Sequence, residues 1–549
     1  MPTIAELVRA RATDEHPAIL FENQSWSYAE YVTACAERAA LLGELRRPGP
    51  FHVGVLLDNV PEFAMWLGAV AVSGAVIVGI NPTRRGAELA RDITHTECQL
   101  LVTEERHAPL LDGIDTGVGD DRVLVMESPA YAGALARHRS AALPDVEIAE
   151  SDLYLLLFTS GTSGAPKACL CSQGRLAGIG VTLSGMVGLG PDDVCYIVMP
   201  MFHSNALMAG WAGALAGGAT SALRRKFSAS GFLPDVRKFG VTYFNYVGKP
   251  LSYILATPER PDDADNPLRL VFGNEGADLD IERFSKRFGV PVIDSYGSTE
   301  GGAVVQRTTD MPPGALGRGR DGVAVLDPET GEETPPARFD AAGRLLNPDE
   351  AIGELVNRLG AKGFEGYWNN DEANTARVHD GIYWTGDLAY RDEQGFLYFA
   401  GRDYDWLRVD GENFAAAPVE RILARHPDVV LAAVYAVPDP EVGDRLMAAL
   451  QLRPGATFDP SGFADFLAAQ QDLGTKWAPR FVRIAATMPV TETSKVLKRV
   501  LRRARWECTD PVWWQPEKGG PYRRLTPADA DALRAEFAAR GHERVLEAT

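Results

Sequence analysis

Small and hydroxylated residues fill positions 159–167, directly after the apolar run of residues 153–158. The apolar run predicts a buried β-strand, and the glycines behind it would let the backbone approach a ligand closely. Hydroxyl and backbone N–H groups donate hydrogen bonds to phosphate oxygens, and a lysine adds positive charge. The stretch therefore predicts a phosphate-binding loop made of Thr159, Ser160, Gly161, Thr162, Ser163, Gly164 and Lys167.

Two residues of this loop, Gly161 and Lys167, have the spacing of a Walker A phosphate-binding loop. However, Pro166 stands where that loop has its second glycine, and Ala168 stands where it has the hydroxyl that binds magnesium. We therefore exclude a P-loop nucleotide hydrolase. For the stretch taken alone, a solvated loop between two strands is the alternative to phosphate binding.

Residues 159–167 are similar to the signature loop of the adenylate-forming superfamily, which includes acyl-CoA synthetases, peptide-synthetase adenylation domains and luciferases. Further motifs of that superfamily follow in its order, so the resemblance covers nearly the whole chain. They are Tyr296-Gly297-Ser298-Thr299-Glu300, Tyr383-Trp384-Thr385-Gly386-Asp387, Gly401-Arg402 and Lys495. The resemblance implies an enzyme that joins a carboxylic acid to AMP, with ATP, Mg²⁺ and coenzyme A as its cofactors.

The resemblance assigns the nucleotide to loops that follow predicted strands, chiefly at residues 270–277 and 292–300. An aromatic face covers a purine, and a hard carboxylate oxygen binds a hard cation, so the residue types suit these roles. A glycine turn with a surface glutamate, and a surface Asp–Arg pair, are the alternatives. The resemblance implies contacts with adenine for Gly276, Ala277 and Tyr296, and it places Gly297 next to Tyr296 in the nucleotide site. It implies that Thr299 contacts phosphate and that Glu300 binds magnesium. Asp387 is implied to accept from a ribose hydroxyl, and Arg402 to contact ribose or phosphate.

Another predicted strand, at residues 196–199, is followed by polar residues that include His203. Ligands of α/β sheets bind at strand ends, and the family places a histidine or an aromatic residue here beside the acyl and phosphate groups. A structural histidine is the equal alternative. The resemblance also implies an acyl pocket beside the small residues Ala206, Ala209 and Gly210, which core packing explains almost as well. Its predicted walls are His203, Asn205, Asn245, Tyr246, Val247 and Gly301.

The last part of the chain carries residues that the resemblance implies for the two half-reactions. Lys495 lies in a basic segment that resembles the loop of the adenylating lysine. Residues 406–414 are predicted to form a loop that moves over the active site, where Gly411 would let the pantetheine arm of CoA pass close to the backbone. The predicted catalytic residues are Lys495, Glu300, Thr159 and His203.

The implied reaction has two steps, because a carboxylate is a poor electrophile until AMP gives it a leaving group. The acid and MgATP give acyl-AMP and pyrophosphate, and the CoA thiol then attacks the acyl carbon and releases AMP. Residues 203–205 and 406–414 look most like those of very-long-chain fatty acid and steroid-type acyl-CoA ligases. We therefore predict an acyl-CoA ligase for a bulky hydrophobic acid of the long-chain, steroid or terpenoid type.

Four other functions occur on this fold or share part of this pattern, and two of them are disfavoured. Ser494 precedes Lys495 where glycine is usual, and a stiffer lysine loop would favour an enzyme that only makes thioesters from a supplied acyl-AMP. A ligase that loads a carrier protein shares every nucleotide-binding residue. A luciferase-like oxidase has no recognisable feature here, and a binding module without catalysis is disfavoured because Lys495 and Glu300 are both present.

Helix-like and strand-like segments alternate through residues 1–100, which predicts a mostly parallel sheet covered by helices. Residues 303–350 are rich in Pro, Gly and Asp and predict the turns of a small β-region. The predicted fold is α/β: a large N-terminal domain of helix-covered, mostly parallel sheets plus the small β-region, followed by a smaller, mobile α+β domain. The predicted bounds are residues 1–402 for the first domain, 403–405 for a hinge and 406–549 for the second.

The chain has 549 residues, of which 46% are hydrophobic, enough to bury large cores in more than one domain. Its net charge of -19 argues against a nucleic-acid partner, because phosphate neutralisation needs a basic surface. The six cysteines lack paired metal-ligand spacing and the N-terminus lacks an export signal, so we expect reduced thiols and a cytoplasmic location. The predicted partner is a small-molecule carboxylic acid or its adenylate.

Residues 63–80 form an uncharged apolar run long enough to be considered as a membrane span. Gly74 divides the run, and the β-branched residues after it predict a helix, a turn and a buried strand instead. We therefore predict no membrane span. Residues 104–150 are acidic and rich in Gly and Ala, and they predict a variable connection without a catalytic role. The oligomeric state is open, with a homodimer as a candidate because the family often dimerises.

Overall fold

The structure, a computed structural model, divides the chain into two units. The first unit comprises residues 1–82, 89–159 and 167–401, and the second comprises residues 83–88 and 402–549 as far as they are described. The structure describes residues 1–159, 167–247, 250–255, 257–274, 276, 278–308, 310–312, 315–328, 330–339, 346–360, 363–402, 406–409, 412–423, 425–440, 443–453, 455–470, 473, 476–489, 496, 498–517 and 519–547.

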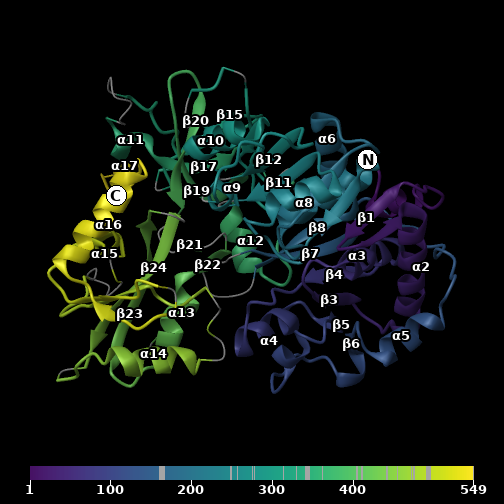
Figure 1. Cartoon of the computed structure of the whole chain (residues 1–549), viewed down its shortest axis with the longest axis horizontal. Coiled ribbons are helices and arrows are strands. Elements are labelled where there is room, and N and C mark those ends of the chain that lie inside the picture. Colours follow the sequence, from purple (N-terminus) through teal and green to yellow (C-terminus); the bar gives the residue numbers. More distant parts are fainter. Residues whose placement is uncertain are drawn as a thin grey trace. The chain divides into compact units, whose positions relative to one another are not determined.

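A six-stranded sheet of the first unit has the order β6-β5-β3-β4-β7-β8 (Figure 1). Every neighbouring pair is parallel except β7 and β8, which are antiparallel. Parallel strands are buried on both faces, which explains why their sequences are apolar runs. The strands are β3 (His52–Leu56), β4 (Val76–Gly79), β5 (Cys98–Thr103), β6 (Val123–Val125), β7 (Leu153–Thr159) and β8 (Lys167–Ser172).

A seven-stranded sheet of the same unit has the order β13-β12-β11-β9-β10-β1-β2, and only β1 and β2 are antiparallel. Four neighbours, β9, β11, β12 and β13, precede the predicted site loops. Because they are parallel, their carboxyl ends lie at one edge of the sheet. The strands are β1 (Pro17–Phe21), β2 (Gln24–Ser27), β9 (Val194–Ile197), β10 (Thr220–Leu223), β11 (Tyr243–Val247), β12 (Leu270–Asn274) and β13 (Val292–Ser295).

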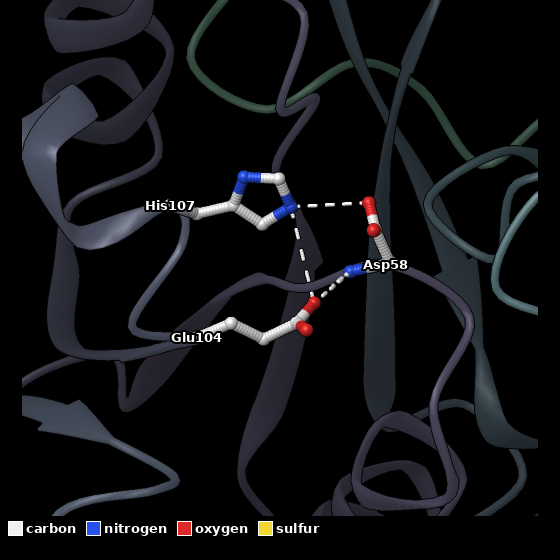
Figure 2. A group of neighbouring side chains, drawn as sticks. All are labelled: Asp58, Glu104 and His107. Carbon is white, nitrogen blue, oxygen red and sulfur yellow. Dashed lines mark hydrogen bonds and ion pairs between the residues drawn. The ribbon is translucent and has the colours of Figure 1, made fainter.

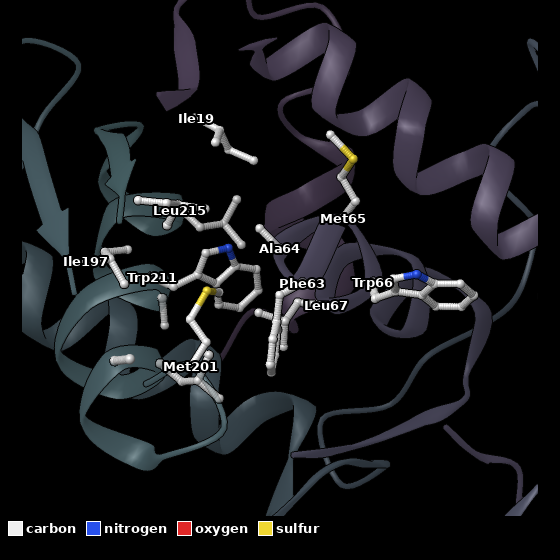
Figure 3. Packing of buried hydrophobic residues seen from close by; sticks show 14 of the residues in the cluster. Ile19, Phe63, Ala64, Met65, Trp66, Leu67, Ile197, Met201, Trp211 and Leu215 are labelled. Atoms are coloured by element: carbon white, nitrogen blue, oxygen red, sulfur yellow. The ribbon is translucent and has the colours of Figure 1, made fainter. Parts of the chain in front are cut away.

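Helix α3 (Pro61–Ser73) lies buried in the largest hydrophobic core of the first unit. Figure 3 shows Phe63 and Leu67 on the side of Trp211 and Met201, with Trp66 on the opposite side of the helix. A helix that is apolar all round is either a core helix or a membrane span, and this one is a core helix. The other helices of this part are α1 (Ile4–Arg9), α2 (Tyr28–Leu45), α4 (Gly86–His95), α5 (Pro129–Ala136), α6 (Gln173–Val187), α7 (Ala212–Gly217), α8 (Phe232–Phe239), α9 (Pro250–Leu255) and α10 (Asp278–Phe288).

The apolar run of residues 63–80 has the predicted structure. Helix α3 ends at Gly74, whose φ of 68° is left-handed and turns the chain into buried strand β4. None of the described helices combines the length and the apolarity that a membrane crossing needs.

The small β-region is an antiparallel sheet with the order β14-β15-β20-β19-β17-β16, and β18 pairs with β19. It confirms the turn-rich β-region that the composition of residues 303–350 predicts. Its elements are β14 (Val305–Gln306), β15 (Gly317–Gly319), β16 (Val323–Leu326), α11 (Pro348–Ala351), β17 (Gly353–Asn357), α12 (Asp371–Arg377), β18 (Val378–His379), β19 (Ile382–Arg391) and β20 (Phe396–Arg402).

The second unit contains a five-stranded sheet with the order β23-β24-β25-β26-β27. Alternate residues of β23 face two separate cores: Val434 and Ala436 belong to one, and Tyr435 and Val437 to the other. Both faces of the sheet are therefore covered, by α13 and α14 on one side and by α15 and α16 on the other. The elements are β23 (Val429–Asp439), β24 (Gly443–Leu452), β25 (Phe481–Ile484), β26 (Val512–Trp514), β27 (Arg523–Arg524), α13 (Ala416–Leu423), α14 (Pro460–Ala468), α15 (Lys498–Ala504), α16 (Pro527–Ala539) and α17 (Glu543–Glu547).

The prediction of a loop at residues 406–414 is wrong for the described part of that segment. Strands β21 (Trp406–Val409) and β22 (Glu412–Ala415) pair antiparallel, with Val409 opposite Glu412. The Asp-Gly pair between them is a common hairpin signal in sequences, and it indicated two strands rather than a loop. Residues 410–411 themselves, which include Gly411, lie outside the described residues.

A buried ion pair joins α2, α3 and α5. Arg38 donates from Nε and Nη2 to the two carboxylate oxygens of Glu62, at 2.7 and 2.6 Å. The Tyr131 hydroxyl also donates to Glu62, and Trp66 Nε1 donates to that hydroxyl at 3.1 Å. Burial raises the pKa of Glu62, but the charge and hydrogen bonds of Arg38 outweigh burial and hold the pKa below its ordinary value.

Glu62→Gln should lower the free energy of unfolding by about 3 kcal/mol, because Arg38 would stay buried without its counter-charge. Denaturant unfolding at neutral pH measures the change. The matched control is Glu44→Gln, which removes a pair with Arg137 at the surface and should leave the unfolding midpoint almost unchanged. Equal effects of the two variants would contradict the assignment.

The same pair predicts a pH dependence. Because the pKa of Glu62 is lowered in the folded state, the ion pair contributes fully to the free energy of unfolding above the ordinary glutamate pKa of 4.5. The contribution is lost as pH falls through the lower folded-state pKa, so the stability gap between wild type and Glu62→Gln should narrow in acid. A gap that stays constant down to the acid unfolding limit would count against the ion pair.

Candidate active site

The predicted phosphate-binding loop joins two antiparallel strands. Thr159 ends β7, Lys167 begins β8, and the two are paired across the ladder. Both are well placed for an anion: Thr159 Oγ1 is buried with no partner among the described residues, and Lys167 is buried. Burial, and after it the charge of Arg377, lower the pKa of Lys167, while Glu300 opposes them. A polyanionic ligand would satisfy the hydroxyl and pair with the amine.

The buried carboxylate of Glu300 accepts a hydrogen bond from the Tyr367 hydroxyl at 2.8 Å. Arg377 Nε in turn donates to that hydroxyl oxygen at 3.2 Å. Lys167 Nζ lies 5.7 Å from the centre of the Tyr367 ring. The structure thus brings together two predicted site residues, Lys167 and Glu300, and adds Tyr367 and Arg377, to which sequence analysis assigns no role in the site. A carboxylate in this setting is the donor type that Mg²⁺ prefers.

Two residues predicted to hold the nucleoside lie together although 91 residues separate them. The Tyr296 hydroxyl donates to Asp387 Oδ2 at 2.7 Å. Asp387 is buried in β19, and its backbone N–H donates to Thr385 Oγ1 at 3.0 Å. The geometry supports one site for an aromatic stacking surface and a ribose-binding carboxylate.

The loop of residues 296–301 is fixed from two sides. Ser204 Oγ lies 2.8 Å from Thr299 Oγ1, which ties this loop to the segment that carries His203. Arg175 of α6 donates to the Thr299 carbonyl oxygen at 2.5 Å and to the Leu170 carbonyl oxygen at 2.9 Å. Neither Ser204 nor Arg175 is a predicted site residue. The only signal in the sequence is the position of Ser204 next to His203.

Of the glycines in this loop, Gly301 has little free space. Gly301 has a φ of 69°, and a Cβ atom there would lie 2.9 Å from Arg175 Nη2. Gly297 is less restricted, because a Cβ atom there would meet only the Asn274 amide, at 3.8 Å. A side chain at position 301 would therefore disturb the arginine that holds Thr299.

The predicted acyl-side residues meet at a π-helix, η3 (Asn205–Trp211), a rare form that is frequent at functional sites. Asn205 Nδ2 donates to the Tyr246 carbonyl oxygen at 3.0 Å, and Asn245 Nδ2 donates to Asn205 Oδ1 at 2.8 Å. Asn245 is fully buried, and its Oδ1 has no hydrogen-bond partner among the described residues. His203 precedes this helix with its ring 4.4 Å from that of Phe202.

Tyr246 and Gly276 share one carboxylate. The Tyr246 hydroxyl donates to Asp294 Oδ2 at 2.5 Å, and the Gly276 backbone N–H donates to the same oxygen at 2.8 Å. Tyr246 is fully buried, whereas Val247, the next predicted wall residue, is half-buried at the end of β11. A Cβ atom at Gly276 would lie 2.6 Å from the Tyr246 hydroxyl, so this position has room only for glycine.

A second group of polar side chains, Asp58, Glu104 and His107, lies buried at the carboxyl ends of β3 and β5 (Figure 2). His107 Nε2 lies 3.0 Å from Asp58 Oδ1 and 3.8 Å from Glu104 Oε1. Arg106 pairs with Asp58 at 2.9 Å, and Arg225 pairs with both carboxylates. A metal ion would have to displace these cations, so we assign the group a structural role. Residues 104–150 therefore do more than connect two elements.

Several predicted site residues lie outside the described residues, and their roles stay predictions. They are Ser160, Gly161, Thr162, Ser163, Gly164, Ala277, Gly411 and Lys495, together with the hinge residues 403–405. For Arg402 only the backbone is described, as the last residue of β20.

Two helix-covered sheets, an antiparallel β-region and a smaller α+β unit, with nucleotide-type residues at the strand ends, define an adenylate-forming enzyme. The fold is similar to that of the amide bond synthetase McbA from Marinactinospora thermotolerans, with a TM-score of 0.74. That comparison has 24% sequence identity and covers 91% of this chain and 99% of the other.

The chain belongs to the AMP-binding enzyme family. Residues 8–368 match the AMP-binding enzyme model, and residues 418–495 match its C-terminal domain model. The chain is 51% identical over 547 residues to steroid-22-oyl-CoA synthetase from Rhodococcus jostii, covering 99% of each chain. It is also 51% identical over 513 residues to medium/long-chain-fatty-acid–CoA ligase FadD17 from Mycobacterium marinum, covering 93% of this chain and 98% of the other.

Gly276→Ala should weaken ATP binding about tenfold, because the new methyl group would collide with the Tyr246 hydroxyl and Asp294 and shift the backbone that is predicted to contact adenine. Isothermal titration calorimetry with ATP measures the effect. Gly185→Ala is the matched control, since a Cβ atom at Gly185 of α6 meets nothing within 4 Å. Unchanged ATP affinity in a folded Gly276→Ala variant would remove Gly276 from the site.

Proposed function

We propose that this chain converts a bulky hydrophobic carboxylic acid into its CoA thioester through an enzyme-bound acyl-AMP. The observation that carries the proposal is that residue types suited to MgATP are joined by short contacts within the first unit. Tyr296 and Asp387 suit the nucleoside, Thr299 and Lys167 suit the phosphates, and Glu300 suits the metal. Membership of the AMP-binding enzyme family supports the same chemistry.

In the first step a carboxylate oxygen attacks the α-phosphorus of ATP and pyrophosphate leaves. Lys495 would neutralise the charge that builds up as two anions approach, and Lys167 and Thr299 would hold the phosphates. Magnesium, held by Glu300, would supply further positive charge at the departing group. In the second step the CoA sulfur bonds to the acyl carbon, AMP leaves with the bonding electrons, and the thiol proton passes to solvent.

The two steps require two different sets of residues at one place. We propose that residues 403–405 act as a hinge, that the first step uses Lys495, and that the second uses the segment around Gly411. The division of the chain after residue 401 supports a hinge at this point. The domain bounds of residues 1–402 and 406–549 are part of this proposal.

The acid is proposed to be long-chain, steroid-like or terpenoid. Its support is the printed activity of two relatives, a steroid-22-oyl-CoA synthetase and a medium/long-chain fatty-acid ligase, each 51% identical to this chain. The small residues Ala206, Ala209 and Gly210 of the π-helix are buried, and a Cβ atom at Gly210 would lie 2.9 Å from Asn245 Oδ1, so the acid class rests on the relatives rather than on these residues. His203, Asn205, Asn245 and Val247 are the proposed surroundings of the acid.

A cytoplasmic location and a homodimer are further proposals. Six cysteines without disulfides in the structure support a reducing compartment, and five of the six are buried. The homodimer rests on the family resemblance alone.

The decisive assay follows AMP, pyrophosphate and acyl-CoA from fatty, steroid and terpenoid acids with MgATP, with and without CoA. Wild type should form acyl-CoA and AMP from at least one class. Lys495→Ala should lower the rate of acyl-AMP formation at least a hundredfold, because it removes the proposed charge neutralisation. Lys498→Ala, which removes a lysine paired with Glu420 at 3.0 Å, is the matched control and should retain activity.

Two outcomes would replace the proposal. Activity confined to synthetic acyl-AMP, equal in wild type and Lys495→Ala, would indicate an enzyme that performs only the thioester step. Transfer to a carrier protein but not to CoA would indicate a carrier-protein ligase.

A further inference from the structure

The contacts of Tyr367 have a fixed hydrogen-bond direction. A guanidinium has only donors, so Arg377 Nε–H must donate to the Tyr367 oxygen across their distance of 3.2 Å. A carboxylate has only acceptors, so the Tyr367 proton must point to Glu300 Oε1, 2.8 Å away. The three side chains therefore form a directed chain from arginine through tyrosine to glutamate.

The tyrosine cannot easily turn away from this chain. Its backbone N–H donates to Asn374 Oδ1 at 2.7 Å, and Asn374 Nδ2 donates to the Tyr367 carbonyl oxygen at 3.2 Å. Its ring packs against that of Phe364, with 5.0 Å between ring centres, and is almost fully buried. Asn374 and Arg377 both belong to α12, so one short helix holds the backbone of Tyr367 through Asn374 and its hydroxyl group through Arg377.

The electrostatic setting keeps the phenol protonated. Burial first, and then the charge of Glu300, raise the pKa of Tyr367 far above its ordinary value, although Arg377 acts in the opposite direction. Arg377 is held as well, because Nη1 donates to the Trp384 carbonyl oxygen at 3.2 Å. In a poorly solvated site such hydrogen bonds are strong and their geometry is well defined.

We propose that Tyr367 and Arg377 are positioning residues that orient Glu300 for the metal of the ATP complex. This inference rests on the proposed role of Glu300 as a magnesium ligand. A carboxylate that holds a metal ion is normally fixed by hydrogen bonds to its outer partners, and loss of such a partner lowers metal affinity by about 10 to 100-fold. Lys167 lies over the face of the Tyr367 ring. Tyr367 therefore contacts both the carboxylate proposed to hold the metal and the lysine proposed to hold the phosphates.

The test compares the affinity for metal-free ATP with the affinity for MnATP, both measured by titration calorimetry. The ratio of the affinity for MnATP to the affinity for metal-free ATP isolates the contribution of the metal from that of the nucleotide. Tyr367→Phe should lower the ratio about 10 to 100-fold while metal-free ATP binding stays the same. In steady-state assays the KM for Mg²⁺ should rise by a similar factor and kcat at saturating Mg²⁺ should change far less. An unchanged ratio in a folded Tyr367→Phe variant would overturn the proposal.

Tyr398→Phe is the matched control, because the Tyr398 hydroxyl also donates to a buried carboxylate, Asp392 Oδ2, at 3.0 Å. Its ratio should equal that of wild type. A loss as large as that of Tyr367→Phe would mean that the loss of any buried phenol–carboxylate bond disturbs the site, which would also overturn the proposal.

Two further variants separate the possible failures. Glu300→Gln should lower the ratio at least as much as Tyr367→Phe does, and if it does not, the metal-binding role of Glu300 in the proposed function fails. Arg377→Met should lower the ratio less than Tyr367→Phe, and the double variant should be no worse than Tyr367→Phe alone, because the two residues act in series. Additive losses would mean that Arg377 acts on the metal site independently of Tyr367.

Discussion

A carboxylate removed from water needs compensation, and the burial of Glu300 imposes this requirement on much of the first unit. Compensation comes from the phenol of Tyr367, which is held in turn by α12. The loop that carries Glu300 is fixed at Thr299 by Arg175 and Ser204. Distant segments must therefore be folded before the carboxylate can occupy its place.

Sheet topology explains why residues 200–300 supply so much of this site. Strands β9, β11, β12 and β13 are parallel neighbours, so the segments that follow them begin at the same edge. Asn205, Gly276 and Thr299 each follow a different one of these strands. The contact between Ser204 and Thr299 is a direct result of this arrangement. Strand β19 of the β-region adds Asp387, which accepts a hydrogen bond from Tyr296.

Strands β4, β7, β9, β12 and β13 and the division of residues 63–80 could be predicted, because buried parallel strands are apolar runs and Gly74 interrupts one of them. The motif residues Tyr296, Glu300 and Asp387 could be predicted as a set but not as contacts, since their pairing depends on tertiary structure. Tyr367 lies in Gly366-Tyr367-Trp368, which resembles a weaker motif of the superfamily, but neither its role nor that of Arg377 could be predicted. The reason is the same: a tyrosine and an arginine are ordinary residues until a carboxylate lies beside them. The pairing of β21 with β22 departs from the predicted loop although the Asp-Gly pair between the two strands is a local hairpin signal.

The segment after residue 495, here called the C-terminal tail, completes the sheet of the second unit. The family match ends at residue 495, but β26 pairs with β25, and Trp506 and Trp514 stack on Phe481 with ring centres 5.1 and 5.8 Å apart. A chain cut at the end of the match would leave β25 as an uncovered edge with an exposed aromatic surface. Such edges join those of other molecules. A C-terminal unit exchanged between relatives would therefore stay soluble only if its tail accompanied its sheet.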